Sequence, residues 1–210
     1  MPNLIEIHLG CNKICEISEN AFRDVKQSVQ NIILDNNCLT QMPSTYIIRS
    51  YTNLIEIHLG CNKICEISEN AFRDVKQSVQ NIILDNNCLT QMPSSALEEM
   101  NSLIALHIKY NHIEELLEGG LRNLSSLSLL SLTGNHISHI SPNFISNVPN
   151  LRYIYLGENQ ISKLESDAMK QFTASEIIDL SHNTMEQINA DTFKGIRRIY
   201  SYPFLMPNGH

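Results

Sequence analysis

A register of aliphatic and asparagine residues returns every 24 or 25 residues, and it constrains this chain more than any other feature. The first unit begins at Leu4, with aliphatic residues at unit positions 1, 4, 6, 11 and 14 and asparagine at position 9. Eight units start near residues 4, 29, 54, 79, 103, 127, 151 and 175. Repeats of fixed period stack into solenoids, in which each unit buries its apolar face against its neighbours.

Residues 3–44 recur without a single change as residues 53–94. The offset of 50 residues is two units of 25, so the copy enters in phase and keeps every core aliphatic in register. The seam at residues 45–52 departs from the pattern at residues 95–100 that follows the second copy. We interpret the copy as a very recent duplication, an engineered chain or an assembly error, and these alternatives stay open.

Each unit is expected to form a strand from position 3 to position 7, because side chains alternate inward and outward there. Neighbouring strands should pair as a parallel sheet, with positions 4 and 6 in the core and positions 3, 5, 7 and 8 on a concave surface. The asparagine amide can donate and accept where the chain turns, so it should connect adjacent units. The asparagines of this ladder are Asn12, Asn37, Asn62, Asn87, Asn111, Asn135, Asn159 and Asn183.

The pattern LxxLxLxxNxL resembles the leucine-rich repeat over roughly residues 3–196. The repeat length and a late phenylalanine, as in Phe22, Phe72, Phe144 and Phe193, are similar to the subgroup of Toll-like receptors, Slit and small leucine-rich proteoglycans. The resemblance implies an α/β horseshoe with about eight short parallel strands on its concave face and irregular or short helical convex segments. It also implies one solenoid domain over 1–196, followed by a degenerate cap or non-native tail at 197–210.

Charge and hydropathy narrow the possible partners. The net charge of -7, without a basic run, argues against nucleic acid, and the chain contains no apolar run of about 18 residues that could span a bilayer. Met1 lies three residues before Leu4, which leaves no room for a secretory signal or an N-terminal cap. We therefore expect a piece of a longer protein.

All six cysteines lie in the two copies, so their even number is no sign of a disulfide framework. Cys11 and Cys61 stand two strands apart, about 10 Å, which is too far for a bridge. Cys15 with Cys38, and Cys38 with Cys65, lie on adjacent units but two positions out of register, so a bridge would need favourable turn geometry. We expect free thiols.

Two histidines suggest a possible metal site, but the surrounding sequence does not supply enough ligands for one. His112 and His136 occupy position 10 of consecutive units and should lie about 5 Å apart. The next unit has Gln160 there, a poor ligand, whereas zinc requires three or four converging ligands. A solvated turn face is expected.

No catalytic motif is present. Gly119-Gly120 is a turn rather than a phosphate loop, and the sequence contains no nucleophile elbow or zinc-protease spacing. We predict a non-enzymatic chain without a cofactor.

The concave face after residue 102 is the predicted site for a protein or peptide ligand. Tyrosine and arginine are enriched in binding hot spots, and both cluster here, with Arg152 expected beside Glu158. The alternative is that the tyrosines only tile an exposed sheet. The site residues are His107, Lys109, Tyr110, Leu129, Arg152, Tyr153, Tyr155, Glu158, Asp179 and His182.

The resemblance implies a ligand-binding or adhesive segment of an extracellular receptor or matrix protein. Asn123 begins the triplet Asn-Leu-Ser, a possible glycosylation site that supports secretion weakly. An intracellular scaffold or regulatory subunit would use the same surface and would suit free thiols. A duplicated gene fragment without a selected function is the third alternative.

Overall fold

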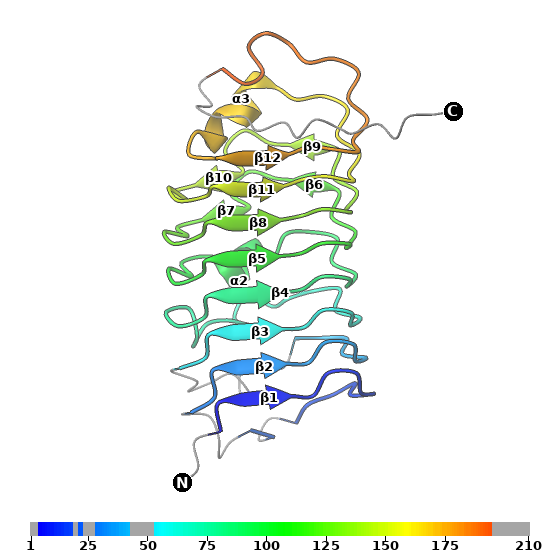
Figure 1. Ribbon diagram of the computed structural model, residues 1–210, viewed down its shortest axis with the longest axis vertical. Coiled ribbons are helices and arrows are strands. Elements are labelled where there is room, and N and C mark those ends of the chain that lie inside the picture. Colours follow the sequence, from blue (N-terminus) through cyan, green and yellow to red (C-terminus); the bar gives the residue numbers. More distant parts are fainter. Residues whose placement is uncertain (1–3, 19–20, 23–27, 43–52, 195–210) are drawn as a thin grey trace, which may run out of the picture.

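The computed structural model describes residues 4–18, 21–22, 28–42 and 53–194, which form a parallel β-solenoid (Figure 1). Its main sheet has eight strands in chain order, so the predicted solenoid with a parallel sheet is confirmed. The seam at residues 45–52 and the tail at 197–210 lie outside the described residues, and so does the first residue of the copied block.

Each main strand occupies positions 3 to 5 of its unit. The strands are β1 (Glu6–His8), β2 (Asn31–Ile33), β3 (Glu56–His58), β4 (Asn81–Ile83), β5 (Ala105–His107), β8 (Leu129–Ser131), β11 (Tyr153–Tyr155) and β12 (Ile177–Asp179). They are in register, so that Ile7 stands opposite Ile32 and Ile32 opposite Ile57. The strands are shorter than the predicted five residues, although backbone bonds such as Leu9 N–H to Ile33 O continue the pairing beyond them.

The backbone is left-handed at position 8 of all eight units. Seven of these residues are not glycine, and a left-handed conformation costs such residues about 1–2 kcal/mol each. The amide of position 8 donates to the next unit's position 7 carbonyl, as in Cys61 N–H to Asp85 O at 2.8 Å. The residues are Cys11, Asn36, Cys61, Asn86, Tyr110, Gly134, Glu158 and His182, with φ from 51° to 71°.

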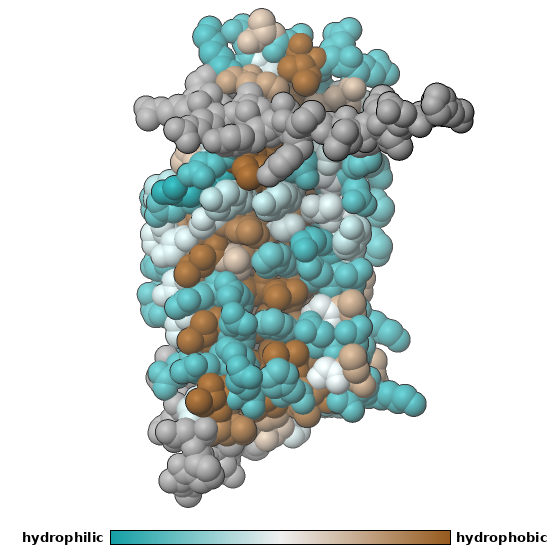
Figure 2. Space-filling model, in the orientation of Figure 1, coloured by the Kyte–Doolittle hydropathy of each residue, from teal (hydrophilic) through white to brown (hydrophobic). Residues whose placement is uncertain are grey.

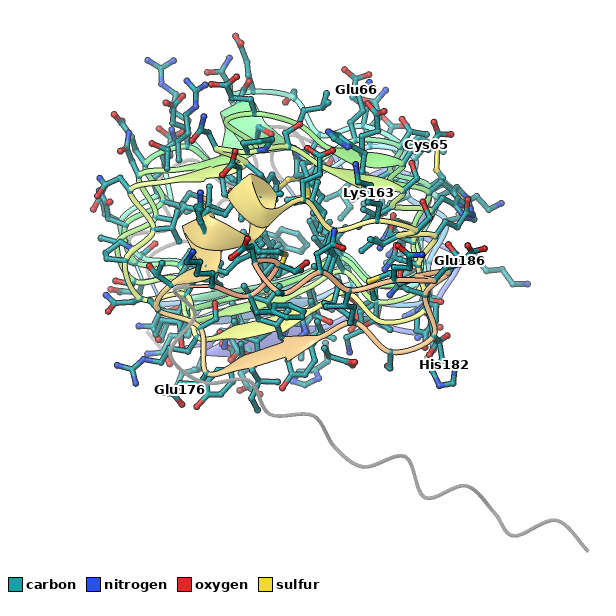
Figure 3. All side chains as sticks on the ribbon, turned by 90° about the horizontal axis from the view of Figure 1, so that it is seen from above. Cys65, Glu66, Lys163, Glu176, His182 and Glu186 are labelled. Atoms are coloured by element: carbon teal, nitrogen blue, oxygen red, sulfur yellow. A yellow bond between two sulfur atoms is a disulfide. The ribbon has the colours of Figure 1, made fainter. Side chains whose placement is uncertain are left out.

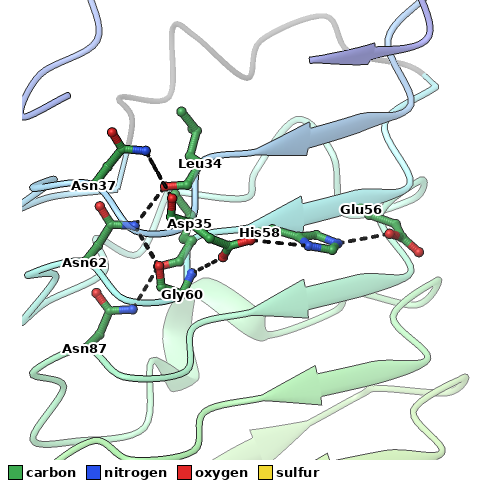
Figure 4. Close-up of polar contacts among 9 residues, drawn as sticks. Leu34, Asp35, Asn37, Glu56, His58, Gly60, Asn62 and Asn87 are labelled. Carbon is green, nitrogen blue, oxygen red and sulfur yellow. Dashed lines mark hydrogen bonds and ion pairs between the residues drawn. The ribbon is translucent and has the colours of Figure 1, made fainter. Parts of the chain in front are cut away.

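The position 9 asparagines bridge neighbouring units directly after this turn. The side-chain amide of Asn62 donates to Leu34 O at 3.0 Å in the preceding unit and to Leu59 O at 3.1 Å in its own (Figure 4). Its oxygen accepts the N–H of Leu39 at 3.0 Å. The side-chain amide of every ladder asparagine after Asn12 donates to a backbone carbonyl of the preceding unit. The bonding asparagines are Asn37, Asn62, Asn87, Asn111, Asn135, Asn159 and Asn183.

The core is the stack of inward aliphatics between the sheet and the convex side. Phe72, Phe144 and Phe172 are fully buried and fill the space behind the sheet. Gly120 makes room for one of them, because a Cβ there would lie 2.3 Å from the Phe144 ring. Ser175 replaces the first aliphatic of the eighth unit, and its buried hydroxyl donates to Leu151 O at 3.2 Å. The one polar substitution in this column is therefore satisfied.

Where the structure describes it, the convex side carries short elements, as the resemblance implied. Two helical turns, α2 (Ser94–Leu97) and α3 (Ser166–Met169), and the 3-10 turn η2 (Lys170–Phe172) lie there. Two small parallel sheets, which the sequence did not predict, pair adjacent units behind the main sheet. Their strands are β6 (Glu115–Leu116) with β9 (His139–Ile140), and β7 (Leu121–Arg122) with β10 (Ile145–Ser146).

The expectation of free thiols throughout is wrong. Cys15 is bonded to Cys38, and Cys65 to Cys88, with Cα–Cα distances of 4.5 and 4.4 Å. Each bridge joins two adjacent units of one copy. The two-position offset does not separate the sulfurs, because the chain beyond position 8 has left the strand direction. Cys11 and Cys61 remain exposed free cysteines.

Candidate functional site

The sheet face of the solenoid is an open surface on which side chains from all eight units meet. It is turned towards the reader in Figure 2, where apolar and hydrophilic patches alternate along the stack. Each strand contributes two outward side chains, at positions 3 and 5. Positions 7 and 8, which follow the strand, complete the face. The predicted site residues all belong to the last four units.

Tyr153 and Tyr155 project from the same side of β11 and are half-buried. Glu176, directly before β12, fixes one end of this pair. Its carboxylate binds the Arg152 guanidinium at 2.7 Å and accepts the Tyr153 hydroxyl at 3.2 Å. The charge of Glu176 raises the pKa of Tyr153, so the hydroxyl remains a donor. Arg152 therefore forms its ion pair with Glu176 in the next unit.

Tyr110 is placed on this face by a glycine in the next unit. A Cβ on Gly134 would lie 2.2 Å from the Tyr110 ring, so the ring rests against the bare backbone at that point. Tyr110 remains 46% exposed. Both residues have positive φ, which directs the tyrosine out of the sheet edge.

The other predicted site residues differ in how freely they could contact a partner. His107 is half-buried, and burial lowers its pKa. Lys109 lies 3.6 Å from the Asp85 carboxylate, which also accepts the Lys109 N–H at 2.7 Å. Leu129 is half-buried at the start of β8. Its strand neighbour Ser131 also faces this side but is only 3% exposed, so the outward position 5 is closed at that unit.

The last two units present acidic and histidine side chains at the edge of the face. Glu158 and His182 are exposed and line the same shallow hollow beside Gln160. Asp179 is half-buried and accepts the N–H of Ser181 at 2.9 Å. This edge can therefore hydrogen-bond a partner next to the tyrosines.

The first half of the face has a different character, because carboxylates and histidines alternate along it. The Nε2 atom of His58 lies 3.0 Å from Glu56, and its Nδ1 atom lies 3.7 Å from Asp35 in the preceding unit (Figure 4). The nearby Asp35 carboxylate is the largest cause that raises the pKa of His58. Asp35 is held by the N–H of Gly60 at 2.6 Å. The same residues in the second copy are arranged differently, since Asp85 meets Lys109 instead of a histidine.

The two turn histidines stack as the repeat spacing predicts. The ring centroids of His112 and His136 are 5.4 Å apart, and Gln160 continues the row with a 3.2 Å contact to His136. Within the described ranges, no three histidine, cysteine, aspartate or glutamate side chains lie close enough together to hold a metal ion. In the same part of the chain, no helix is both long and apolar enough to cross a membrane.

The glycosylation triplet lies on the convex side, at a left-handed residue. Asn123 has φ of 55°, is partly exposed, and its side-chain oxygen accepts from Asn147 at 3.0 Å. Asn147 occupies the same position of the next unit. The two amides thus form a small surface ladder of their own.

Two residues that hold the tyrosines were missed by sequence reasoning. Glu176 stands 24 residues after Arg152, at the same position of the next unit, so the unit register alone could have paired them. Gly134 likewise stands 24 residues after Tyr110. Because neighbours in a solenoid are one period apart, each candidate residue should be read together with the residue one period away.

Comparison with solved structures gives the same architecture. Toll in its complex with Spatzle, from Drosophila, has a TM-score of 0.75 at 22% identity over 86% of this chain and 25% of that chain. The complex of Latrophilin 3, Unc5D and the leucine-rich repeat part of FLRT2 gives 0.69 at 21% over 86% and 62%. The TLR13 complex with single-stranded RNA gives 0.69 at 22% over 89% and 30%. The chain spans less than two thirds of each of these proteins.

No curated protein matches the chain. The sequence profile described as leucine rich repeat matches residues 77–137, 125–184 and 149–200, which together cover more than half of the 210 residues. These matches coincide with the units whose strands and asparagine bonds are described above. The chain therefore belongs to the leucine-rich repeat family.

Proposed function

We propose that this chain is a protein-binding segment of an extracellular leucine-rich repeat protein, with no catalytic role. Its solenoid would be one domain over residues 1–196. It would recognise a protein or peptide ligand through the last four units of the sheet face. The observation that carries this proposal is the pair Tyr153 and Tyr155, half-exposed on β11, with the Tyr153 hydroxyl held by the Glu176 carboxylate.

Pre-organisation is the physical reason that this pair suits recognition. Ordering a side chain at an interface costs about 0.5–1.5 kcal/mol, and a tyrosine already held by a hydrogen bond has less freedom to lose. Tyrosine also combines a large apolar ring with a polar tip, which favours the wet interfaces of protein complexes. Tyr110, seated on Gly134, adds a second rigid aromatic surface nearby along the sheet.

Two disulfides support an extracellular compartment. Cys15–Cys38 and Cys65–Cys88 join adjacent units, and such bonds persist in oxidising surroundings but are rare in the cytosol. Among the similar structures, Toll is seen with Spatzle, and FLRT2 with Unc5D and Latrophilin 3. These complexes favour a protein ligand for this chain as well.

RNA is the ligand in the TLR13 complex but suits this chain poorly. The net charge is -7, and carboxylates of Asp35, Glu56 and Asp85 line the first half of the sheet face. Nucleic-acid affinity depends on neutralising phosphates with lysine and arginine. A protein partner is therefore the better candidate.

The test first identifies a partner that binds the intact protein. The affinity of that partner is then measured for single variants. Tyr153→Ala and Tyr155→Ala should each weaken binding by at least about 1 kcal/mol, whereas Tyr153→Phe should retain most of the affinity because it keeps the ring. Glu186→Gln, an exposed change away from the patch, is the control. Unchanged affinity in both alanine variants would refute the site.

A further inference from the structure

A second candidate surface lies behind the sheet, on the convex flank of the third, fourth and fifth units. Two hollows meet there, with volumes of about 670 and 450 Å³. Thr90, Gln91, Met92 and Ser94 line both, so the two hollows adjoin along this segment and are together called the flank groove. Glu66 and Cys65 project from this flank, on the side away from the main sheet (Figure 3).

The walls of the flank groove are fixed in place by the fold. Cys65 lies on one rim and is bonded to Cys88, which ties the third unit to the fourth. The first turn of α2 borders the other side, with Pro93 and Ala96 buried. A partner would meet a preformed depression rather than a loop that must first be ordered.

Apolar side chains lie at the base of the groove, within a lining that is otherwise largely polar. Ile67 and Leu89 are buried beneath it, and Met92 is half-buried between the two hollows. Leu117 lines the second hollow with 54% of its surface exposed, although it is a large aliphatic residue. An exposed leucine inside a depression provides apolar area that a partner can cover.

Five exposed carboxylates surround this apolar base. Glu66 and Glu69 line the first hollow, and Glu114, Glu115 and Glu118 line the second. No lysine, arginine or histidine of the described ranges lines either hollow, and none of the five forms an ion pair with a described residue. The Arg122 guanidinium lies against Gly119 at one end, and His139 stands opposite Glu115 in the small parallel sheet.

We infer that the flank groove binds a short extended segment of a protein partner in which lysine or arginine alternates with apolar residues. In such a segment the cations would point to the carboxylate rims and the apolar side chains to Met92 and Leu117. Unpaired charges around a depression concentrate their field within it and attract the opposite charge. This surface is separate from the tyrosine patch and does not depend on it.

The test uses a fluorescent pentapeptide of alternating lysine and leucine, KLKLK, and anisotropy at low ionic strength with the full chain. The peptide should bind saturably, and salt should weaken it because exposed charges are screened. Glu114→Gln, Glu115→Gln and Glu118→Gln together should raise the Kd at least about tenfold. Leu117→Ser, which leaves the net charge unchanged, should also raise it.

Matched controls make the result decisive. Glu16→Gln, Glu165→Gln and Glu186→Gln remove the same number of charges from exposed sites outside the groove and should change the Kd by less than about threefold. Equal effects of the two triple variants would show diffuse attraction to an acidic protein and would overturn the proposal. So would equal binding of ELELE, which would assign the groove to apolar capture alone, or no binding of KLKLK. Tyr153→Ala should leave peptide binding unchanged, which separates this surface from the sheet face.

Discussion

Asp35 and His58 approach to 3.7 Å across the boundary at which the first copy meets the second, although no sequence outside the copies contributes to the contact. In the second copy, the residue equivalent to Asp35 is Asp85, and its neighbour is Lys109. The duplication has thus created an ion pair that neither copy contains by itself. The same local sequence also occurs in two environments, which provides matched experiments.

The Asp35–His58 contact should make stability depend on pH. The folded state raises the pKa of His58, so the contribution is complete below the unfolded value of about 6.5 and is lost as pH rises through the folded value. His58→Gln should therefore destabilise the protein more at pH 5.5 than at pH 8, as measured by urea unfolding. His8→Gln changes the same residue of the first copy, which contacts Glu6 alone among the described residues, and should show a weaker pH dependence. Equal pH profiles for the two variants would argue against the Asp35 contact.

Asn62 and Asn12 offer a second matched pair. Asn62 is buried and bonds to the preceding unit through both its nitrogen and its oxygen, whereas Asn12 is exposed and bonds only to Leu9 O and Gly10 O in its own turn. Asn62→Ala should cost about 1–3 kcal/mol of unfolding free energy, because it leaves buried groups unpaired. Asn12→Ala should cost less than about 0.5 kcal/mol. Chemical denaturation gives both values, and the reverse ranking would contradict the ladder assignment.

The number of disulfide bonds can be determined by thiol labelling before their contribution to stability is measured. Alkylation of the folded protein without reductant should label two thiols, Cys11 and Cys61, and all six cysteines should react after reduction and unfolding. Cys88→Ser should then cost about 2–4 kcal/mol, since it opens a loop across two units. Cys61→Ser should be nearly neutral. Six labelled thiols in the unreduced protein would rule out the bridges.

Gly134 should affect both the stability of the fold, through its backbone conformation, and partner binding, through the position of the Tyr110 ring. Gly134→Ala places a side chain at φ of 71° and moves the Tyr110 ring, so it should cost about 1–2 kcal/mol of stability and weaken partner binding. Tyr110→Ala should weaken binding with little change in stability, because the ring is 46% exposed. Melting curves and binding isotherms of the two variants separate these effects. If Gly134→Ala left stability and partner binding unchanged, the position of the Tyr110 ring would not depend on the absence of a side chain at Gly134.

The repeat register predicts the main sheet because every unit repeats the same inward aliphatics. It gives the parallel pairing, the burial of Ile57 and Leu59, and the 5 Å spacing of His112 and His136. It fails where the chain leaves the strand direction. The Cys15–Cys38 bridge and the convex strands follow turns whose path depends on left-handed residues at position 8, and no residue type marks that position across the eight units.

The tyrosine patch was foreseen only in part, for a related reason. Tyr153 and Tyr155 could be placed on the sheet face from their alternation along one strand. Their support comes from residues one period away, which reading a single unit does not reveal. The flank groove had no sequence signal, since its shape follows from Pro93 and α2 turning inward in one unit.

The unchanging register of the main sheet has a mechanical consequence. Adding two units moves everything before the insertion away from everything after it by two strand spacings, about 10 Å, without reshaping either part. An in-phase copy of two units would therefore change the distance between the surfaces on either side of it while leaving each surface intact.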